Sequence, residues 1–268
     1  MPLAVCATPI GNLDDVTLRV LGELRSADVV LCEDTRHTRV LLDRHGIQAR
    51  LVSYHEHNEA KRTAEILPRL EAGERVALVS DAGVPGISDP GARLVGAALA
   101  AGVPVTVLPG ASAVDTALVA SGFAAERFQF LGFLPRGATA LERLWAELAG
   151  WPHPAVAFES PQRLPATLRS LASAQPEREV AVCRELTKRF EEVVRGTSAE
   201  VATQFGEPPK GEITLVLGPG GRAGAGDEET AAAAVAELVA EGVPRRRAAD
   251  IVARLTDTSR NELYRRTL

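Results

Sequence analysis

The sequence predicts an α/β protein made of two α/β domains and a small C-terminal helical extension. Three observations support this class. Ten short apolar runs lie within residues 1–218, and most are separated by segments of about 10–15 residues with helical spacing. The stretch "GPGGRAGAGDEE" (218–229) is glycine-rich and is predicted to be a flexible linker. Beyond it the chain has no strand pattern.

The first five runs, in order, are "PLAVCAT", "ADVVLCED", "ARLVSY", "RVALVSD" and "VPVTVLPG". Between the first two, Val16, Val20, Leu21 and Leu24 recur at the spacing of a helix. Strands that alternate with helices in this way are typical of a mostly parallel sheet. Because a break is expected near "LPGAS", we assign residues 1–110 to an N-terminal α/β domain.

The second half carries the runs "RFQFLGF", "PAVAFES", "EVAVCRE" and "EITLVLG", and "RFEEVVRG" is expected to add a strand to a more mixed sheet. We assign residues 111–220 to this second α/β domain. Residues 228–268 are predicted to form two or three short helices. They would break at "GVP" (242–244) and near Ser259, a candidate N-cap.

Composition limits the function classes. The net charge is −5, so the protein as a whole is not a basic nucleic-acid-binding protein. Cys6, Cys32 and Cys183 have no metal or disulfide spacing, so buried thiols in a reducing compartment are expected. No charged segment precedes the short N-terminal apolar run, and no stretch approaches the roughly 20 apolar residues of a membrane span. We therefore expect a cytoplasmic protein with no membrane partner.

Three loops rich in small residues follow three of the predicted strands: "TPIGNLDDVT", "VSDAGVPGISDPG" and "LPGASAVDTA". Open α/β sheets bind ligands at the carboxyl ends of their strands. Neither G-x-G-x-x-G nor a P-loop is present, so a ligand would be held in another way. In the second loop, Asp89 before Pro90 is expected to cap the next helix. Asp81 has no such role and is either a solvated turn residue or a ligand contact.

Ten segments carry a family resemblance. They are, in order, "ATPIGNLDDVTLRVLGEL", "CEDTRHTRVLL", "SYHEHNE", "LVSDAGVPGISDPG", "VLPGASAVDTALVASG", "FLGFLPR", "FESPQRL", "CRELTKRFEE", "GEITLVL" and "SRNELYR". Together they resemble the tetrapyrrole methylase superfamily and, within it, the family of ribosomal RNA small subunit methyltransferase I. The resemblance covers nearly the whole chain and departs at Gln162, where His is expected.

The resemblance implies that S-adenosylmethionine (SAM) binds in the cleft between the two α/β domains. It also implies methylation of the ribose 2′-hydroxyl of a cytidine in small-subunit (16S) rRNA. The implied cofactor contacts lie in the three loops and the second domain: Ile10, Gly11, Asp81, Ala82, Gly83, Val84, Ser112, Ala113, Phe158, Leu186, Ile213 and Thr214. The Asp81 carboxylate would attract the positive sulfonium and amino group of the cofactor.

The candidate catalytic residues are Glu33, Asp34 and Glu159 as proton acceptors, with Arg36, or alternatively Arg184, to orient phosphate or stabilise the developing oxyanion. The alternative for residues 33–39 is an acidic helix start with a solvated polar face. His55 and His57 flank Glu56, but no further ligand follows at metal spacing, so no metal is expected.

The partner implied is small-subunit rRNA or the 30S subunit, and a homodimer is considered. The candidate RNA-binding residues are Arg36, Arg39, His57, Arg184, Arg245, Arg246, Arg247, Arg260 and Arg265. Residues 245–268 hold seven Arg and three acids, a local net charge of +4. This tail is either an RNA-binding appendage or a packed helical unit with a solvated basic face.

Two other functions remain open. A precorrin or porphyrinoid methylase would share the SAM cleft, but a macrocycle substrate gives no reason for a basic helical tail. A non-enzymatic RNA-binding ribosome-assembly factor would have no need of the intact loops around Asp81 and Ser112.

Overall fold

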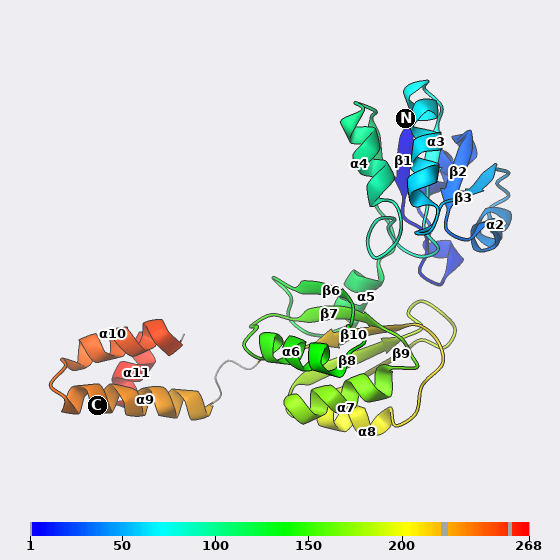
Figure 1. The fold of residues 1–268 in the computed structure, drawn as a ribbon. Coiled ribbons are helices and arrows are strands. Elements are labelled where there is room, and N and C mark those ends of the chain that lie inside the picture. The colour runs from blue at the N-terminus through cyan, green and yellow to red at the C-terminus, as the bar shows by residue number, and fades with distance from the viewer. Residues whose placement is uncertain (1, 221–224, 257–258, 268) are drawn as a thin grey trace.

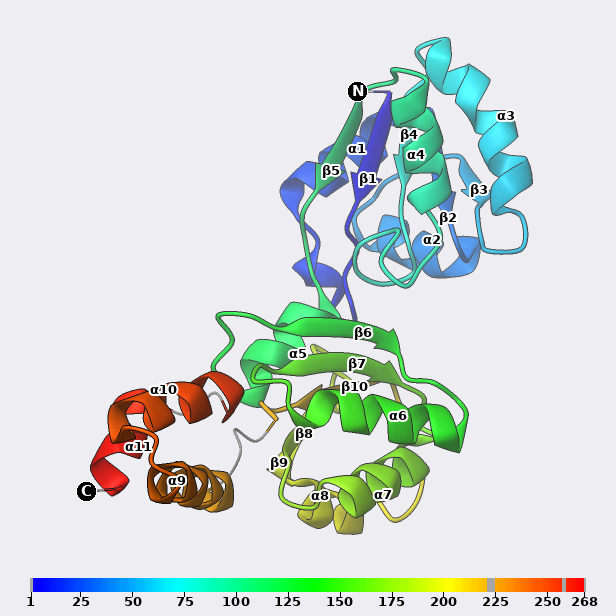
Figure 2. The same cartoon turned by 60° about the vertical axis from the view of Figure 1, so that its left-hand side comes forward.

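The computed structural model describes residues 2–220, 225–256 and 259–267. Two five-stranded sheets follow one another along the chain, and three helices come after the second (Figure 1). Figure 2 shows α5 (Ala113–Ser121) between the two sheets and the last three helices beside the second sheet. The prediction of two α/β units and a helical extension is confirmed.

The first sheet has the strand order β3-β2-β4-β1-β5, and all neighbouring strands are parallel. Its strands are β1 (Leu3–Cys6), β2 (Val29–Cys32), β3 (Leu51–Ser53), β4 (Val76–Leu78) and β5 (Val105–Leu108). The connecting helices are η1 (Leu13–Asp15), α1 (Leu18–Ser26), α2 (Thr35–Arg44), α3 (Glu59–Glu71) and α4 (Ala92–Ala100).

Helices cover both faces of this sheet, which explains why its strands read as continuous apolar runs. On one face, Ile66 of α3 and Leu94 of α4 pack on Leu3, Val29 and Leu78. The opposite face carries α1 and α2, and Val20, Leu21 and Leu24 of α1 are buried there as predicted, whereas Val16 lies before the helix and is partly buried. Because β4, β1 and β5 are neighbouring parallel strands, their carboxyl ends lie next to one another at one edge of the sheet.

The second sheet is mixed. Its order is β6-β7-β10-β8-β9, with β6 parallel to β7 and the other pairs antiparallel. The strands are β6 (Gln129–Phe133), β7 (Ala155–Glu159), β8 (Glu179–Arg184), β9 (Glu192–Thr197) and β10 (Ile213–Leu217). The helices are α6 (Ala138–Ala149), α7 (Leu164–Ala174) and α8 (Ser198–Gln204). The extra strand expected at "RFEEVVRG" is β9, although pairing begins only at Glu192.

One face of the second sheet packs on α6, α7 and α8 around the fully buried Trp145. The other face packs on α5, through Ala117 and Leu118, and on two side chains from loops, Ile10 and Leu186. Because Ile10 follows β1 of the first sheet, this face joins the two halves of the molecule.

The C-terminal helices are α9 (Ala225–Ala240), α10 (Arg245–Thr256) and α11 (Arg260–Arg266). They share a small core of their own, in which Val235, Ala248, Ala249 and Leu263 are fully buried. The linker predicted over 218–229 is wrong from Ala225 onward, because the acidic residues before the alanine run favour a helix start. Residues 221–224 lie outside the described part. Ser259 is the N-cap residue of α11, without a side-chain capping bond.

The three cysteines are free and buried, as predicted. Within the part of the chain that the structure describes, none of the helices has the length and apolar character needed to cross a membrane.

Candidate functional site

The loops that follow β1 and β4 are locked together at the edge of the first sheet. The Thr8 N–H donates to the Gly83 carbonyl (2.8 Å) and the Gly83 N–H to the Thr8 carbonyl (3.0 Å), while the Thr8 hydroxyl donates to the Ser80 carbonyl (3.0 Å). Gly83 has φ +79°, a left-handed conformation that glycine adopts without strain. These bonds fix the floor of a pocket.

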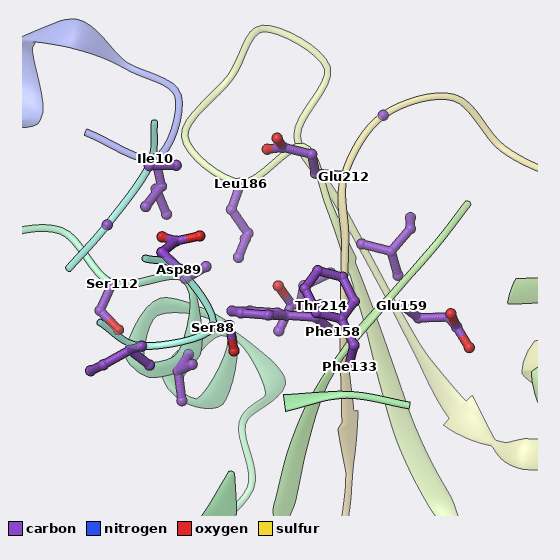
Figure 3. A pocket seen from close by; sticks show the side chains of 18 of the residues that line it. Ile10, Ser88, Asp89, Ser112, Phe133, Phe158, Glu159, Leu186, Glu212 and Thr214 are labelled. Atoms are coloured by element: carbon purple, nitrogen blue, oxygen red, sulfur yellow. The ribbon is translucent and has the colours of Figure 1, made fainter. Parts of the chain in front are cut away.

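The pocket has a volume of about 460 Å³ and is lined from both halves of the molecule (Figure 3). This size suits a drug-sized or nucleoside-sized ligand. The first half contributes the loops after β1 and β4. The loop after β5 and the start of α5 follow at the junction, and β6, β7, β8 and β10 of the second sheet complete the wall.

Most of the predicted cofactor residues meet in this pocket. Those that line it are Ile10, Ala82, Gly83, Val84, Ser112, Ala113, Phe158, Leu186, Ile213 and Thr214. Gly11 and Asp81 are outside the lining. Gly11 instead packs against the loop after β8, and the Asp81 carboxylate accepts the backbone N–H of Asp34 at 3.0 Å. Asp81 thus ties the β4 loop to the start of α2.

Three carboxylates line the pocket, those of Asp89, Glu159 and Glu212, and the sequence prediction treated Asp89 as a helix cap. That prediction is wrong, because the N-cap of α4 is Gly91 and the helix begins at Ala92. Figure 3 shows the Asp89 side chain across the pocket from Phe158 and Glu159. Burial, followed by the negative charges of Glu33 and Asp81, raises the pKa of the Asp89 carboxyl to about 6.

Glu33 and Asp34 lie beside this wall and differ in environment. Burial and the charge of Asp81 raise the pKa of the Glu33 carboxyl. Asp34 is the N-cap residue of α2: its carboxylate accepts the Arg36 N–H at 2.8 Å and pairs with the Arg36 guanidinium at 2.7 Å. Those bonds from Arg36 hold the pKa of Asp34 well below its usual value. The acidic helix start considered from the sequence therefore describes Asp34.

Glu159 lines the pocket but its carboxylate is fully engaged. One oxygen accepts the Ser160 N–H (2.6 Å) and pairs with Arg163, and the other accepts the Thr167 hydroxyl (2.6 Å). The residue is 3 % exposed. These bonds hold β7 to the start of α7.

Aromatic rings form the side of the pocket given by the second sheet. Phe158 lies edge-on to Phe133, with ring centroids 5.4 Å apart, and to Phe130 at 5.1 Å. Phe133 is nevertheless 63 % exposed, so its ring stands at the mouth of the pocket.

The Cys183 thiol also lines the pocket. Burial raises its pKa to about 11, so the thiol is neutral at pH 7.

Several lining residues were not predicted as site residues. They are Ile87, Ser88, Asp89, Val114, Phe133, Ser160, Pro161, Cys183, Gly211 and Glu212. The motif "SDAGVPGISDPG" already contained Ile87, Ser88 and Asp89, so its rigidity was a usable signal. The residues from β6 and β8 carry no local signal, because their inward direction depends on the register of the mixed sheet.

The candidate RNA-binding residues are spread over the surface. Arg36 and Arg39 are exposed on α2, and His57 is exposed before α3. Arg184 is half-buried and bound to Glu192 (2.9 Å) and to the Lys210 carbonyl (3.1 Å). On the C-terminal helices, Arg246, Arg247 and Arg265 are exposed, Arg245 is half-buried and Arg260 pairs with Asp250. Among the described residues, no group of three or more His, Cys, Asp or Glu side chains is placed to hold a metal ion.

The fold and the pocket between two α/β units define a tetrapyrrole methylase. The family model for "Tetrapyrrole (Corrin/Porphyrin) Methylases" matches residues 2–202, and the chain belongs to that family. A solved structure of uroporphyrin-III-C-methyltransferase from Thermus thermophilus is 22 % identical with a TM-score of 0.58, covering 81 % of this chain and 93 % of that one. Diphthine synthase gives a TM-score of 0.63 at 15 % identity, over 81 % of this chain and 89 % of that one. At such identities these structures show the fold alone.

Within this class, the chain belongs to the ribosomal RNA small subunit methyltransferase I family. The relative of that name from Mesorhizobium japonicum is 45 % identical over 99 % of this chain and 91 % of its own length. The one from Thermotoga maritima is 47 % identical over 80 % of this chain and 97 % of its own. Residues 225–268 match the "RsmI C-terminal HTH domain". The family resemblance drawn from the motifs is confirmed.

Proposed function

We propose that this protein transfers the methyl group of SAM to the 2′-hydroxyl of a cytidine in small-subunit (16S) rRNA. The observation that supports it most is the pocket, which takes loops from the carboxyl ends of three neighbouring parallel strands and closes them with the second sheet. The methyl donor is S-adenosylmethionine. It supplies a methyl group already activated by a positive sulfur.

The lining fits such a donor. Its walls are largely apolar, with a few polar groups such as Ser88, Asp89 and Ser112, as small-molecule sites usually are. Gly83 favours the turn in this wall through its φ of +79°, which side chains other than glycine rarely adopt. We assign the adenosine to the apolar side around Phe158 and Thr214. The positive end would lie near Asp89 rather than Asp81.

In the reaction, the ribose 2′-oxygen forms a bond to the methyl carbon as the sulfur–carbon bond breaks. The sulfur keeps the electron pair, and the hydroxyl proton must go to a base. Holding oxygen, carbon and sulfur in line can contribute roughly 7–11 kcal/mol. We assign the base to Asp89. It lines the pocket, and its pKa of about 6 leaves it ionised at neutral pH yet more basic than an ordinary aspartate.

The other candidate bases fit this role less well. Asp34 is a weak base while Arg36 holds it, and Glu159 is engaged on both oxygens. Glu33 does not line the pocket, and its charge helps to raise the pKa of Asp89. We therefore assign to Glu33 the role of raising the pKa of the Asp89 carboxyl. Arg36, Arg39 and the basic tail would bind phosphates of the RNA, which position a substrate without reading its sequence.

We further propose that the working substrate is the 30S subunit in the cytoplasm.

We also propose that the protein is a homodimer. Two apolar side chains are strongly exposed: Val107 of the edge strand β5 is 56 % exposed and Val119 of α5 is 82 % exposed. A second copy would cover these residues. Light scattering of the purified protein reports its mass, and a monomer would end this part of the proposal.

One experiment tests the main proposal. Radiolabelled SAM is offered with purified 30S subunits, with protein-free 16S rRNA and with 50S subunits as a control, and the label is mapped by digestion and mass spectrometry. We expect a single 2′-O-methylated cytidine in 16S rRNA. Label on a base, or transfer only to an added porphyrinoid, would contradict the proposal.

A further inference from the structure

A short loop between β8 and β9, residues 185–191, joins the two halves of the molecule beside the pocket. Leu186 near its start is buried and lines the pocket. One residue further on, the Thr187 hydroxyl accepts the backbone N–H of Asn12, at 3.0 Å, from the loop after β1. The fit there is close, because a Cβ on Gly11 would collide with Lys188 and lie 2.8 Å from the Thr187 hydroxyl.

The same loop holds backbone strain. Among the described residues other than glycine, only Ser88, Glu185 and Thr187 have positive φ, at 60°, 52° and 66°. Such conformations cost energy and persist where the surroundings impose them, often at functional sites. Ser88 lines the pocket, and the other two belong to this loop.

Ionic contacts hold the loop in shape. Lys188 pairs with Glu185 at 2.9 Å and with Glu212 at 2.7 Å, and Glu212 itself lines the pocket. The Glu212 N–H also donates to the Glu185 carboxylate at 3.0 Å, and the Glu191 carboxylate accepts the Thr187 N–H at 2.5 Å. The loop is therefore rigid although it reaches the surface.

This rigid loop presents an aromatic ring and a cation to solvent. Phe190 is 64 % exposed, and the Arg189 guanidinium carbon lies 5.5 Å from the centre of its ring. No acidic side chain in the described part of the chain pairs with Arg189. The loop thus holds an exposed aromatic ring with a cation close to it, four residues after the pocket-lining Leu186.

We propose that residues 185–191 form a docking loop for unpaired rRNA, in which the Phe190 ring stacks on a base next to the target nucleotide and Arg189 contacts a phosphate. This inference rests on the proposed RNA substrate. Single-stranded bases stack on aromatic side chains, and such stacking needs no hydrogen-bond partner on the ring. The adjacent cation favours a nucleic acid over an apolar protein surface. The rigid loop would lose little entropy on binding.

The test compares Phe190→Ala, Phe190→Trp and Arg189→Ala with Phe128→Ala, a control at another exposed phenylalanine (40 % exposed). Binding of 30S subunits is measured with S-adenosylhomocysteine present, together with KM and kcat for 30S methylation, calorimetric SAM affinity and molecular mass. We expect Phe190→Ala to weaken 30S binding and raise KM by about 5- to 150-fold, the range that corresponds to loss of one stacked base. Phe190→Trp should retain most of the binding, and Arg189→Ala should flatten the salt dependence.

SAM affinity, mass and the behaviour of Phe128→Ala should match the wild type. The proposal is overturned if Phe190→Ala binds 30S normally, if SAM affinity falls in parallel, or if the mass halves, which would make Phe190 a subunit contact. Methylation by the wild type reports separately on the proposed function. Since the binding arm needs no turnover, failure of either idea is recognisable on its own.

Discussion

At the scale of single residues, the pH dependence of methylation should follow Asp89. Its pKa of about 6 predicts that kcat/KM for 30S subunits rises as the pH increases through 6 and then levels off. At saturating SAM, Asp89→Asn should lower kcat by about 10²- to 10⁴-fold and remove this acidic limb. Glu33→Gln should move the limb to lower pH, because it removes a neighbouring negative charge. If the limb instead vanishes in Glu33→Gln and persists in Asp89→Asn, Glu33 is the base.

Asp89→Asn, which should lower activity, should raise the stability of the folded protein at neutral pH. The folded protein raises the pKa of Asp89 above its ordinary value of 3.8, so this group's contribution is fully present below about pH 4 and is lost as the pH rises through 6. Asp89→Asn should therefore be more stable at pH 7, by about 1 kcal/mol after allowance for solvent screening, or about 2–4 °C in melting temperature. At pH 4 the two proteins should melt together. Calorimetry at both pH values checks this; a destabilised variant at pH 7 would mean that the carboxylate is not strained there.

The residues that line the pocket could largely be predicted from the sequence, because three loops of small residues follow strands. Ten of the twelve residues expected to contact the cofactor line the pocket. The roles of Asp81 and Asp89 could not. Both lie in one loop, and which carboxylate faces the ligand depends on where the turn ends. That turn extends two residues past Asp89, to Gly91, whose φ is +143°. A Cβ at Gly91 would lie 3.1 Å from Leu78 and 3.2 Å from the Gly86 nitrogen, so the turn is closely packed there.

At the scale of elements, α4 is capped from another helix. Gly91 has no side chain to cap it, and its N–H donates instead to the Glu59 carboxylate of α3 at 3.1 Å; the Tyr54 hydroxyl donates to the same oxygen at 3.1 Å. Glu59→Ala should cost about 1–2 kcal/mol of unfolding free energy and weaken SAM binding, because the pocket loop loses its anchor. Glu59→Gln keeps an acceptor and should lose much less. Chemical denaturation and calorimetry on the two variants test this, and equal losses would refute capping.

Elements themselves were predictable to a large extent, because each strand is short, apolar and bracketed by turn residues. The start of α9 was not, because glycines in 218–226 outweighed the acidic residues that follow. Nor does the sequence reveal that the loop after β8 reaches the loop after β1, where Asn12 and Thr187 are bonded although 175 positions separate them. Contacts of this kind arise from the packing of the two sheets, which no local pattern encodes.

At the scale of the whole molecule, we predict that the basic tail acts as a separate RNA-binding unit. The three C-terminal helices, α9 to α11, bury an apolar core of their own, and the tail, residues 245–268, carries a net charge of +4 on a chain of −5. A protein ending at Gly220 should keep its SAM affinity and melting temperature but show a higher KM for 30S subunits. The slope of log affinity against log salt should become less steep by about 0.7–0.9 for each phosphate that the tail no longer neutralises. Such a tethered unit would work by raising the local concentration of RNA at the pocket. Should truncation instead halve the mass or lower the melting temperature while the salt slope stays constant, the helices serve packing or dimerisation, as exposed Leu255 would then suggest.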